Sequence, residues 1–328
     1  MVDDVNELIA KAKKSFKFYI GAGDDPNSKL NKIPVGIDVL DRLLKGGLKR
    51  GGFHIFVGPY STGKTFLGQQ AIRNVQVLGG STVYIDAERR YDPDWFALSG
   101  IDVSKLLIAR PTFGEEAIDL VCFYLDKKVD FIFVDSMAAL VPEAELLADS
   151  SDQFIGLQSR MFTTAFRSIT PKNTNSVIVA TNQLRQNIGS RFNPGILKKM
   201  PGGEAQYYFS SLIMEVTRKG WITEKGEEDS GEEKLSAKRR SVGFNISCFI
   251  EKCNYAPPFK SCEIPFSFMT GQLDNTAAVI NLAVDLDIIK QTAAWYAYKD
   301  QKILGKQAVY DYFSKNTAEL EELKKLIL

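Results

Sequence analysis

From Gly51 onward, short continuous apolar runs alternate with longer stretches whose apolar residues recur at helical spacing. The apolar runs cover residues 53–58, 82–87, 106–110, 131–135 and 176–182. Between two of them, apolar side chains fall at i, i+3, i+4 and i+7, namely Ile118, Val121, Cys122 and Leu125. Strands that are apolar throughout and alternate with helices are typical of a parallel sheet buried on both faces. The pattern therefore predicts an α/β fold with a mostly parallel sheet.

The pattern changes in the last third of the chain. Polar or small residues there alternate with Val242, Phe244, Ile246, Cys248 and Ile250, which predicts an antiparallel strand. The segment 224–240 before it is dense in charge and has little to bury, so we expect an exposed hairpin insertion. Helical stretches flank WYAYKDQKIL at 295–304, which indicates a small C-terminal α/β domain.

The predicted organisation has three segments. Residues 3–18 can form a short basic amphipathic helix, and a stretch with the Gly, Pro and Asn of a linker follows it. We assign 1–32 to this helix and linker, 33–270 to the core with the parallel sheet, and 271–328 to the C-terminal domain.

Composition narrows the function classes. The chain has 328 residues, with 41 Lys and Arg against 40 Asp and Glu, so it is no polycation, although local patches can still bind nucleic acid. The only histidine, His54, excludes most zinc enzymes and Ser-His-Asp hydrolases and is expected to be structural. The four cysteines form no C-x-x-C pair and, without a secretory start or membrane span, predict a cytoplasmic protein with reduced thiols.

One motif carries specific chemistry. Residues 58–65 match G-x-x-x-x-G-K-[ST] between a predicted strand and helix, the context that a phosphate-binding P-loop requires. Its backbone N–H groups and the helix N-terminus would hold phosphates, with Lys64 on the β- and γ-phosphates and Thr65 on Mg²⁺. The alternative is a glycine-rich turn with a surface lysine. The motif predicts ATP and Mg²⁺ as cofactors, bound through Gly58, Pro59, Tyr60, Ser61, Thr62, Gly63, Lys64 and Thr65.

Polar residues follow three other predicted strands. Asp135 ends one strand, where a carboxylate would orient Mg²⁺, although it could instead cap the next helix. Glu88 could hold an attacking water or form a surface salt bridge, and Gln183 could sense the γ-phosphate or cap a loop. Because ligands bind at the carboxyl ends of parallel strands, we expect all of these residues to meet.

A long basic loop points to nucleic acid. Residues 184–203 show no regular pattern and carry Arg185, Arg191, Lys198 and Lys199 with interleaved apolar residues such as Ile188. Such a loop suits phosphate contacts combined with wedging or stacking on bases, whereas the alternative is a lid over the nucleotide. A shorter loop at about 143–156 precedes a helix that carries Arg160 and Arg167, and we predict that it is a second DNA-binding loop. Taken alone, it would be a plain acidic loop.

These residues resemble the RecA family of homologous-recombination ATPases, which includes phage recombinases. The resemblance spans nearly the whole chain and rests on GPYSTGKT, YIDAERRYDP, VDSMAALVP, GLQSRM, TNQLRQNIGSRFNPG, PGGEA and YAPPFK in this order. It implies a RecA-like P-loop core, an N-terminal helix that packs on a neighbouring subunit, and a small C-terminal α/β domain.

The resemblance also implies residue roles. Glu88 would activate water, Asp135 would orient Mg²⁺, Asp92 and Trp95 would contact adenine, and Gln183 would relay γ-phosphate occupancy to the DNA loop. Lys252 would reach the neighbouring subunit's nucleotide, and Tyr208 would pack across that interface. The single strand would be contacted by two apolar wedges and a set of phosphate-binding residues, Ile155 and Ile188 together with Arg160, Thr163, Arg167, Gly202 and Gly203.

The chain departs from the family pattern at three places. Asn254 replaces a second interface lysine, which predicts slower or differently coupled hydrolysis. Glu204 replaces a neutral residue beside the DNA. The chain ends at EELKKLIL without an acidic tail, so we expect no autoinhibition by a tail.

We therefore expect a cytoplasmic ATP-dependent recombinase, in the bacterial nucleoid or a phage-infected cell. It would form helical filaments of its own subunits on single-stranded DNA and exchange strands with homologous duplex, with single-strand-binding and mediator proteins as further partners. A P-loop helicase or motor would instead form closed rings. A small-molecule kinase would phosphorylate an acceptor without stimulation by DNA.

Overall fold

The computed structural model describes residues 5–15, 31–148, 156–186, 198–223, 228–229 and 241–327, with backbone alone at 185–186, 198–199 and 228–229. The chain divides into two compact units, 1–32 and 33–328, of which the first contains α1 (Val5–Ser15). The predicted N-terminal helix is therefore present at 5–15, and the rest of its predicted range, 3–18, lies outside the described residues. The second unit contains the central sheet.

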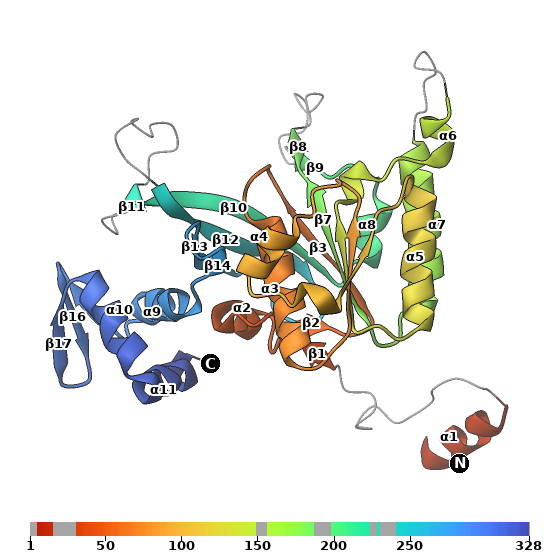
Figure 1. Ribbon diagram of the computed structural model, residues 1–328. Coiled ribbons are helices and arrows are strands. Elements are labelled where there is room, and N and C mark those ends of the chain that lie inside the picture. The colour runs from red at the N-terminus through yellow and green to blue at the C-terminus, as the bar shows by residue number, and fades with distance from the viewer. Residues whose placement is uncertain are drawn as a thin grey trace, which may run out of the picture. The chain divides into compact units, whose positions relative to one another are not determined.

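A large mixed sheet forms the centre of this unit (Figure 1), with the strand order β14-β13-β12-β10-β3-β7-β6-β4-β5 and β11 paired with β10. Its strands are β3 (Gly52–Gly58), β4 (Thr82–Asp86), β5 (Leu106–Ala109), β6 (Phe131–Asp135), β7 (Val177–Gln183), β10 (Leu212–Thr223), β11 (Glu228–Asp229), β12 (Ser241–Cys253), β13 (Ser261–Ser267) and β14 (Gln272–Leu273). All pairs from β10 through β5 are parallel, and those from β10 to β12, β13 and β14 are antiparallel. The predicted mostly parallel α/β sheet is confirmed.

Helices cover both faces of the parallel region. The helices of the second unit are α2 (Asp38–Leu43), α3 (Lys64–Val77), α4 (Pro93–Leu98), α5 (Gly114–Asp126), α6 (Glu143–Leu146), α7 (Leu157–Lys172), α8 (Ala205–Phe209), α9 (Asn275–Asp285), α10 (Lys306–Lys315) and α11 (Thr317–Ile327). The short strands are β1 (Lys32–Ile33), β2 (Leu48–Lys49), β8 (Arg185–Gln186), β9 (Lys198–Lys199), β15 (Lys290–Thr292), β16 (Trp295–Tyr298) and β17 (Gln301–Leu304). In Figure 1, α3 and α4 lie on one side of the sheet, and α5 and α7 lie on the other.

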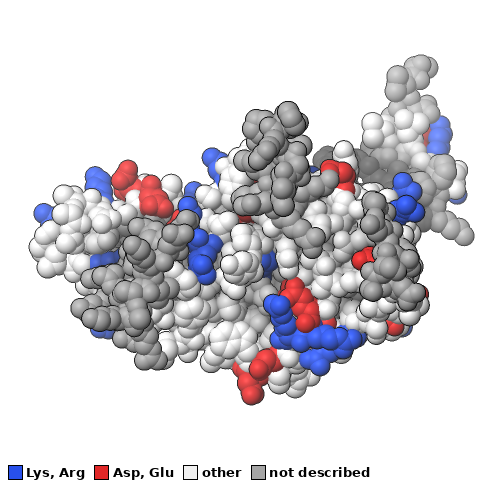
Figure 2. All heavy atoms as spheres, turned by 90° about the horizontal axis from the view of Figure 1, so that it is seen from above, with Lys and Arg blue, Asp and Glu red and all other residues white. Residues whose placement is uncertain are grey.

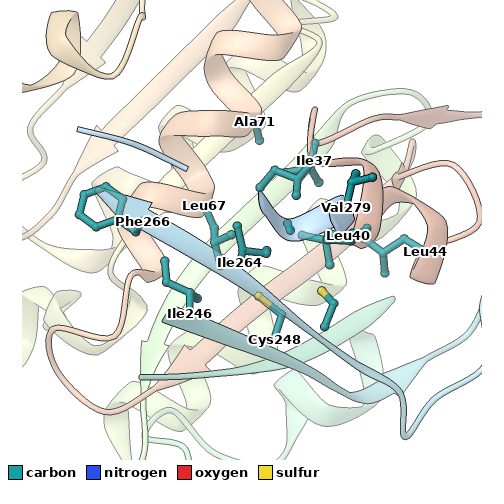
Figure 3. Close-up of a cluster of buried hydrophobic side chains, with 14 of the residues drawn as sticks. Ile37, Leu40, Leu44, Leu67, Ala71, Ile246, Cys248, Ile264, Phe266 and Val279 are labelled. Carbon is teal, nitrogen blue, oxygen red and sulfur yellow. The ribbon is translucent and has the colours of Figure 1, made fainter. Parts of the chain in front are cut away.

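Alternate side chains of each parallel strand enter different cores. On β7, Val177 and Val179 join a core with α3, whereas Ile178 and Ala180 join a core with α5 and α7. The first core also contains Leu67 and Ala71 of α3 together with Ile246 of β12 (Figure 3). A strand buried on both faces can carry polar groups at low cost only where it ends, so polar chemistry is concentrated at the strand ends.

Close packing also fixes the position of α3. A Cβ atom built on Gly68 would lie 2.1 Å from the ring of Phe133 on β6. A larger residue at this position would therefore push the helix away from the sheet. Because α3 begins at Lys64, this contact positions the P-loop as well.

Two segments differ from the pattern-based expectation. β12 is covered on both faces, because Asn245 and Ser247 are 4% and 7% exposed where alternation predicts solvent. The segment 184–203 is not wholly irregular, because Arg185 pairs with Lys199 and Gln186 with Lys198 in the ribbon β8–β9. In the C-terminal region, the expected helices flank a three-stranded sheet of β15, β16 and β17.

His54 on β3 provides a test of the buried core. It is fully buried, and its Nδ1 lies 2.9 Å from the Ile178 carbonyl oxygen. Its Nε2 has no hydrogen-bond partner among the described residues. Burial lowers the pKa of His54 from 6.5 to about 4, so the folded protein holds the neutral imidazole where the unfolded chain takes up a proton.

The stabilisation from neutral His54 should be complete above pH 6.5 and disappear as the pH falls toward 4. Between pH 7 and pH 5 the contribution of His54 to the free energy of unfolding falls by about 2 kcal/mol. From pH 7 to pH 5, the free energy of unfolding of His54→Leu should therefore fall by about 2 kcal/mol less than that of the wild type. Urea unfolding of both proteins at the two pH values measures this difference. Equal losses in the two proteins would show that His54 does not titrate in this way.

Candidate nucleotide site and nucleic-acid interface

A hollow lined by polar, charged and aromatic side chains lies at the carboxyl ends of the parallel strands. It has a volume of about 460 Å³. The register of the sheet brings the ends of these strands level with one another. Gly58 lies beside Gln183, and Asp86 lies beside Asp135. The predicted residues that line it are Tyr60, Ser61, Thr62, Gly63, Lys64, Thr65, Glu88, Trp95, Asp135 and Gln183. The sequence prediction that these strand ends converge therefore agrees with the geometry.

The P-loop turns sharply from β3 into α3. Gly63 adopts a φ of 97° as the N-cap of α3, and a Cβ there would lie 2.3 Å from Cδ1 of Ile246. Only glycine fits both the conformation and the space. The Lys64 Nζ donates to the carbonyls of Gly58 at 3.1 Å and Pro59 at 2.5 Å, and burial lowers the pKa of Lys64. These two carbonyls hold the ammonium inside the turn of the loop.

Asp135 receives hydroxyl donors from three elements. Thr65 Oγ1 donates to Oδ2 at 2.8 Å, Tyr84 OH donates to Oδ2 at 3.2 Å, and Thr181 Oγ1 donates to Oδ1. Burial raises the pKa of Asp135, while the hydroxyl donors act in the opposite direction. The short 3-10 turn that follows begins after Ser136, so Asp135 is not its capping residue. Hard oxygen donors from Thr65 and Asp135 at one place are the ligand type that Mg²⁺ prefers.

Glu88 lies across the cavity on the loop after β4. Ser136 Oγ donates to its Oε1 at 2.6 Å, and Arg90 Nη1 lies 3.1 Å from its Oε2. The alternative of a salt bridge is thus realised, yet Glu88 also lines the cavity. Gln183, at the end of β7, is exposed to the same cavity.

Of the two residues predicted to contact adenine, Trp95 lines the cavity and Asp92 does not. The Asp92 carboxylate caps α4 by accepting from the N–H groups of Asp94 at 2.9 Å and Trp95 at 3.1 Å. Asp92 is outside the set of cavity-lining residues, whereas the Trp95 ring is among them, with its centroid 5.9 Å from that of Phe66.

The cavity has an aromatic wall that no motif signals. Trp221, Phe244 and Phe268 come from the antiparallel region of the sheet, and Arg218 lies 4.3 Å from the centroid of the Trp221 ring. Trp221 has no motif context in the sequence, because its place at the cavity depends on the long-range pairing of β10 with β12. Tyr84 is likewise recognisable only from the structure.

Lys252 lies outside this cavity. Its Nζ donates to the carbonyls of Tyr207, Tyr208 and Ser210, the last at 2.9 Å, at the C-terminal end of α8. Burial lowers the pKa of Lys252. The Tyr208 side chain beside it is 80% exposed.

Five of the predicted nucleic-acid residues lie on α7 or against it. Arg160 and Arg167 are exposed and Thr163 is half-buried between them, at a spacing that places all three on one helix face. Gly202 and Gly203 have φ values of 98° and 83°, and their Cβ atoms would meet Phe162 and Ser159 of α7 at 2.7 Å. The 201–203 turn therefore packs directly on this helix.

The long loop is described only at its base. Arg185, Lys198 and Lys199 belong to β8 and β9, which lie at the end of the molecule where β7 ends (Figure 1). Ile155, Ile188 and Arg191 lie outside the described residues. Seen from that end, basic and acidic side chains lie next to one another (Figure 2). Within the described ranges, no helix is long and apolar enough to cross a membrane.

Comparison with known proteins identifies the family. The model of the RecA N-terminal domain matches residues 5–272, and that of the RecA C-terminal domain matches residues 277–328. "Protein RecA" of Arthrospira platensis is 33% identical over 98% of this chain and 86% of its own length. "Protein RecA" of Francisella tularensis subsp. novicida is 35% identical over 91% of this chain and 80% of its own length. The chain therefore belongs to the RecA family and is an ATP-dependent DNA recombinase, a DNA-dependent ATPase that catalyses strand exchange.

Proposed function

We propose that ATP and Mg²⁺ bind in the cavity at the carboxyl ends of the strands, with the phosphates on residues 58–65. The observation that carries this proposal is the convergence of Lys64, Thr65, Asp135 and Glu88 in one hollow. Thr65 and Asp135 would hold Mg²⁺, which neutralises phosphate charge when bound. Trp95 would stack on the base. Asp92 would contribute by capping α4, which holds Trp95 in place.

Hydrolysis follows from the carboxylate opposite the P-loop. Glu88 would accept a proton from the attacking water, and the Ser136 hydroxyl at 2.6 Å would hold the carboxylate in place. Lys64 would exchange two backbone carbonyls for phosphate oxygens, which restores a favourable environment for its charge. Gln183 would sense whether the γ-phosphate is present.

Assembly would complete the site. As a member of the RecA family, the chain binds DNA and forms filaments of its own subunits. In the filament, Lys252 would leave the C-terminal end of α8 and reach the neighbour's nucleotide, with exposed Tyr208 packed across the interface. Because Asn254 supplies no second charge there, Lys252 would act alone. The N-terminal segment, residues 1–32, would pack on the next subunit, separate from the core at 33–270 and the C-terminal domain at 271–328.

The single strand would lie along the α7 face and the adjacent loop. Arg160 and Arg167 would bind phosphates by charge, and the backbone N–H groups of Gly202 and Gly203 would approach them closely. Arg185, Arg191, Lys198 and Lys199 would add charge from the loop, and Ile155 and Ile188 would wedge between bases. Single-strand-binding and mediator partners and a cytoplasmic location stay predictions.

Glu88→Gln should retain ATP and single-stranded DNA binding but hydrolyse ATP roughly 10²- to 10⁴-fold more slowly, the effect of losing a general base. Steady-state ATPase assays with DNA, paired with nucleotide binding, measure both quantities. Glu263→Gln, which changes an exposed glutamate on β13, is the matched control and should behave as the wild type. Undiminished turnover by Glu88→Gln would remove this carboxylate from the mechanism.

Arg160→Ala should flatten the salt dependence of single-strand binding. Each lost phosphate contact reduces the slope of log K against log[salt] by about 0.7. Lys172→Ala, near the opposite end of α7, is the control and should leave the slope unchanged. Fluorescence anisotropy with a labelled oligonucleotide at several salt concentrations gives both slopes, and an unchanged slope for Arg160→Ala would exclude this contact.

A further inference from the structure

Strand β7 ends with three polar residues that point in alternate directions. Thr181 donates to Asp135, and Gln183 lines the nucleotide cavity, so both lie on the side of the P-loop. Asn182 between them is fully buried and points to the opposite face, where Ile178 and Ala180 of the same strand also pack. The last turn of this strand therefore contacts two sites at once.

Asn182 makes its contacts with the turn that precedes α8. Its Nδ2 donates to the Pro201 carbonyl at 3.1 Å and to Oε1 of Gln206 at 2.9 Å. Its Oδ1 accepts from the backbone N–H of Gln183 at 2.8 Å. The same side chain thus holds the backbone of the residue that lines the nucleotide cavity.

Gln206 completes the connection from α8. It is fully buried, and its Nε2 donates to the carbonyls of Pro201 at 2.8 Å and Gly203 at 2.9 Å. Because buried amides are costly to leave unpaired, the end of β7 and this turn should move together or not at all. No motif in the sequence marks Gln206.

The Pro201–Gly203 turn packs on α7. Gly202 and Gly203 contact Phe162 and Ser159 so closely that neither tolerates a Cβ without movement. Thr163 Oγ1 donates to the Ser159 carbonyl at 2.7 Å, one helical turn along the face that carries Arg160. A displacement of the turn would therefore reach the residues that we assign to DNA phosphates.

We propose that the Asn182–Gln206 amide pair positions the Pro201–Gly203 turn according to the state of Gln183, and so couples nucleotide occupancy to DNA affinity. The inference rests on the proposed nucleotide and DNA sites. It adds to them the side chains that join the two sites through the sheet. Gln206 is a positioning residue, since it acts through the turn.

The coupling is measurable as a ratio of affinities. We would determine the affinity for a fluorescent oligothymidylate with a slowly hydrolysed ATP analogue and with ADP, for the wild type and Gln206→Met. Methionine keeps the shape and removes the hydrogen bonds. We expect the ratio of the two affinities to fall by about 2- to 30-fold, the range by which such changes alter coupling. Linkage requires the DNA-induced change in nucleotide affinity to fall by the same factor, which a general loss of stability would not produce.

Two further variants serve as a replacement for Gln206→Met and as a control. Asn182→Ala breaks the same link from the strand and replaces Gln206→Met if that protein does not fold. Asn173→Ala removes another buried amide, which donates to the Gly52 carbonyl at 3.3 Å at the opposite end of the sheet, and should leave the ratio unchanged. An unchanged ratio in folded Gln206→Met or Asn182→Ala would overturn the proposal. A wild type whose DNA affinity does not depend on the nucleotide would instead overturn the proposed function on which it rests.

Discussion

The burial of the parallel strands on both faces is the constraint on which the rest of this structure depends. Side chains of β3, β4, β6 and β7 enter two separate cores, so the strands can carry polar groups at low cost only where they end. Register then brings the ends of β6 and β7 to the P-loop, and Asp135 accepts hydroxyl donors from Thr65, Tyr84 and Thr181. The first residues of α3, the end of β6 and the end of β7 thus meet at one buried carboxylate.

The same constraint explains how one strand can serve two sites. Since side chains alternate along a strand, the end of β7 presents Thr181 and Gln183 to the nucleotide side and Asn182 to the side of α7. A small movement of this strand end would displace groups on both faces of the sheet. Asn182 is bonded to the Pro201–Gly203 turn, and close packing on α7 leaves that turn little room. In the coupling that we propose, the hydrogen bonds of Asn182 and Gln206 would link the end of this strand to the turn.

Much of this arrangement could be predicted from the sequence. Residues 58–65, Asp135, Glu88 and Gln183 were recognisable because each follows a continuous apolar run, and parallel topology brings such ends together. His54 was correctly expected to be structural. The strand boundaries also followed the pattern closely, because continuous apolar runs and helical spacing are local signals.

The rest depends on contacts between residues far apart in the chain. Trp221 reaches the cavity at the strand ends through a strand pairing with an irregular register between β10 and β12. Lys252 donates to carbonyls of α8, and Gln206 donates to a turn, so their partners are backbone groups that no residue pattern reveals. Asn245 and Ser247 of β12 are buried although their polar side chains alternate with apolar ones, and alternation alone does not indicate this burial.

A cryo-electron microscopy structure of the protein with single-stranded DNA and a slowly hydrolysed ATP analogue tests the central claim most directly. The account predicts a helical filament in which the γ-phosphate contacts Lys64 of one subunit and Lys252 of the next, with DNA phosphates along the α7 face and residues 202–203. A strand bound elsewhere, or a nucleotide held entirely within one subunit, would contradict it.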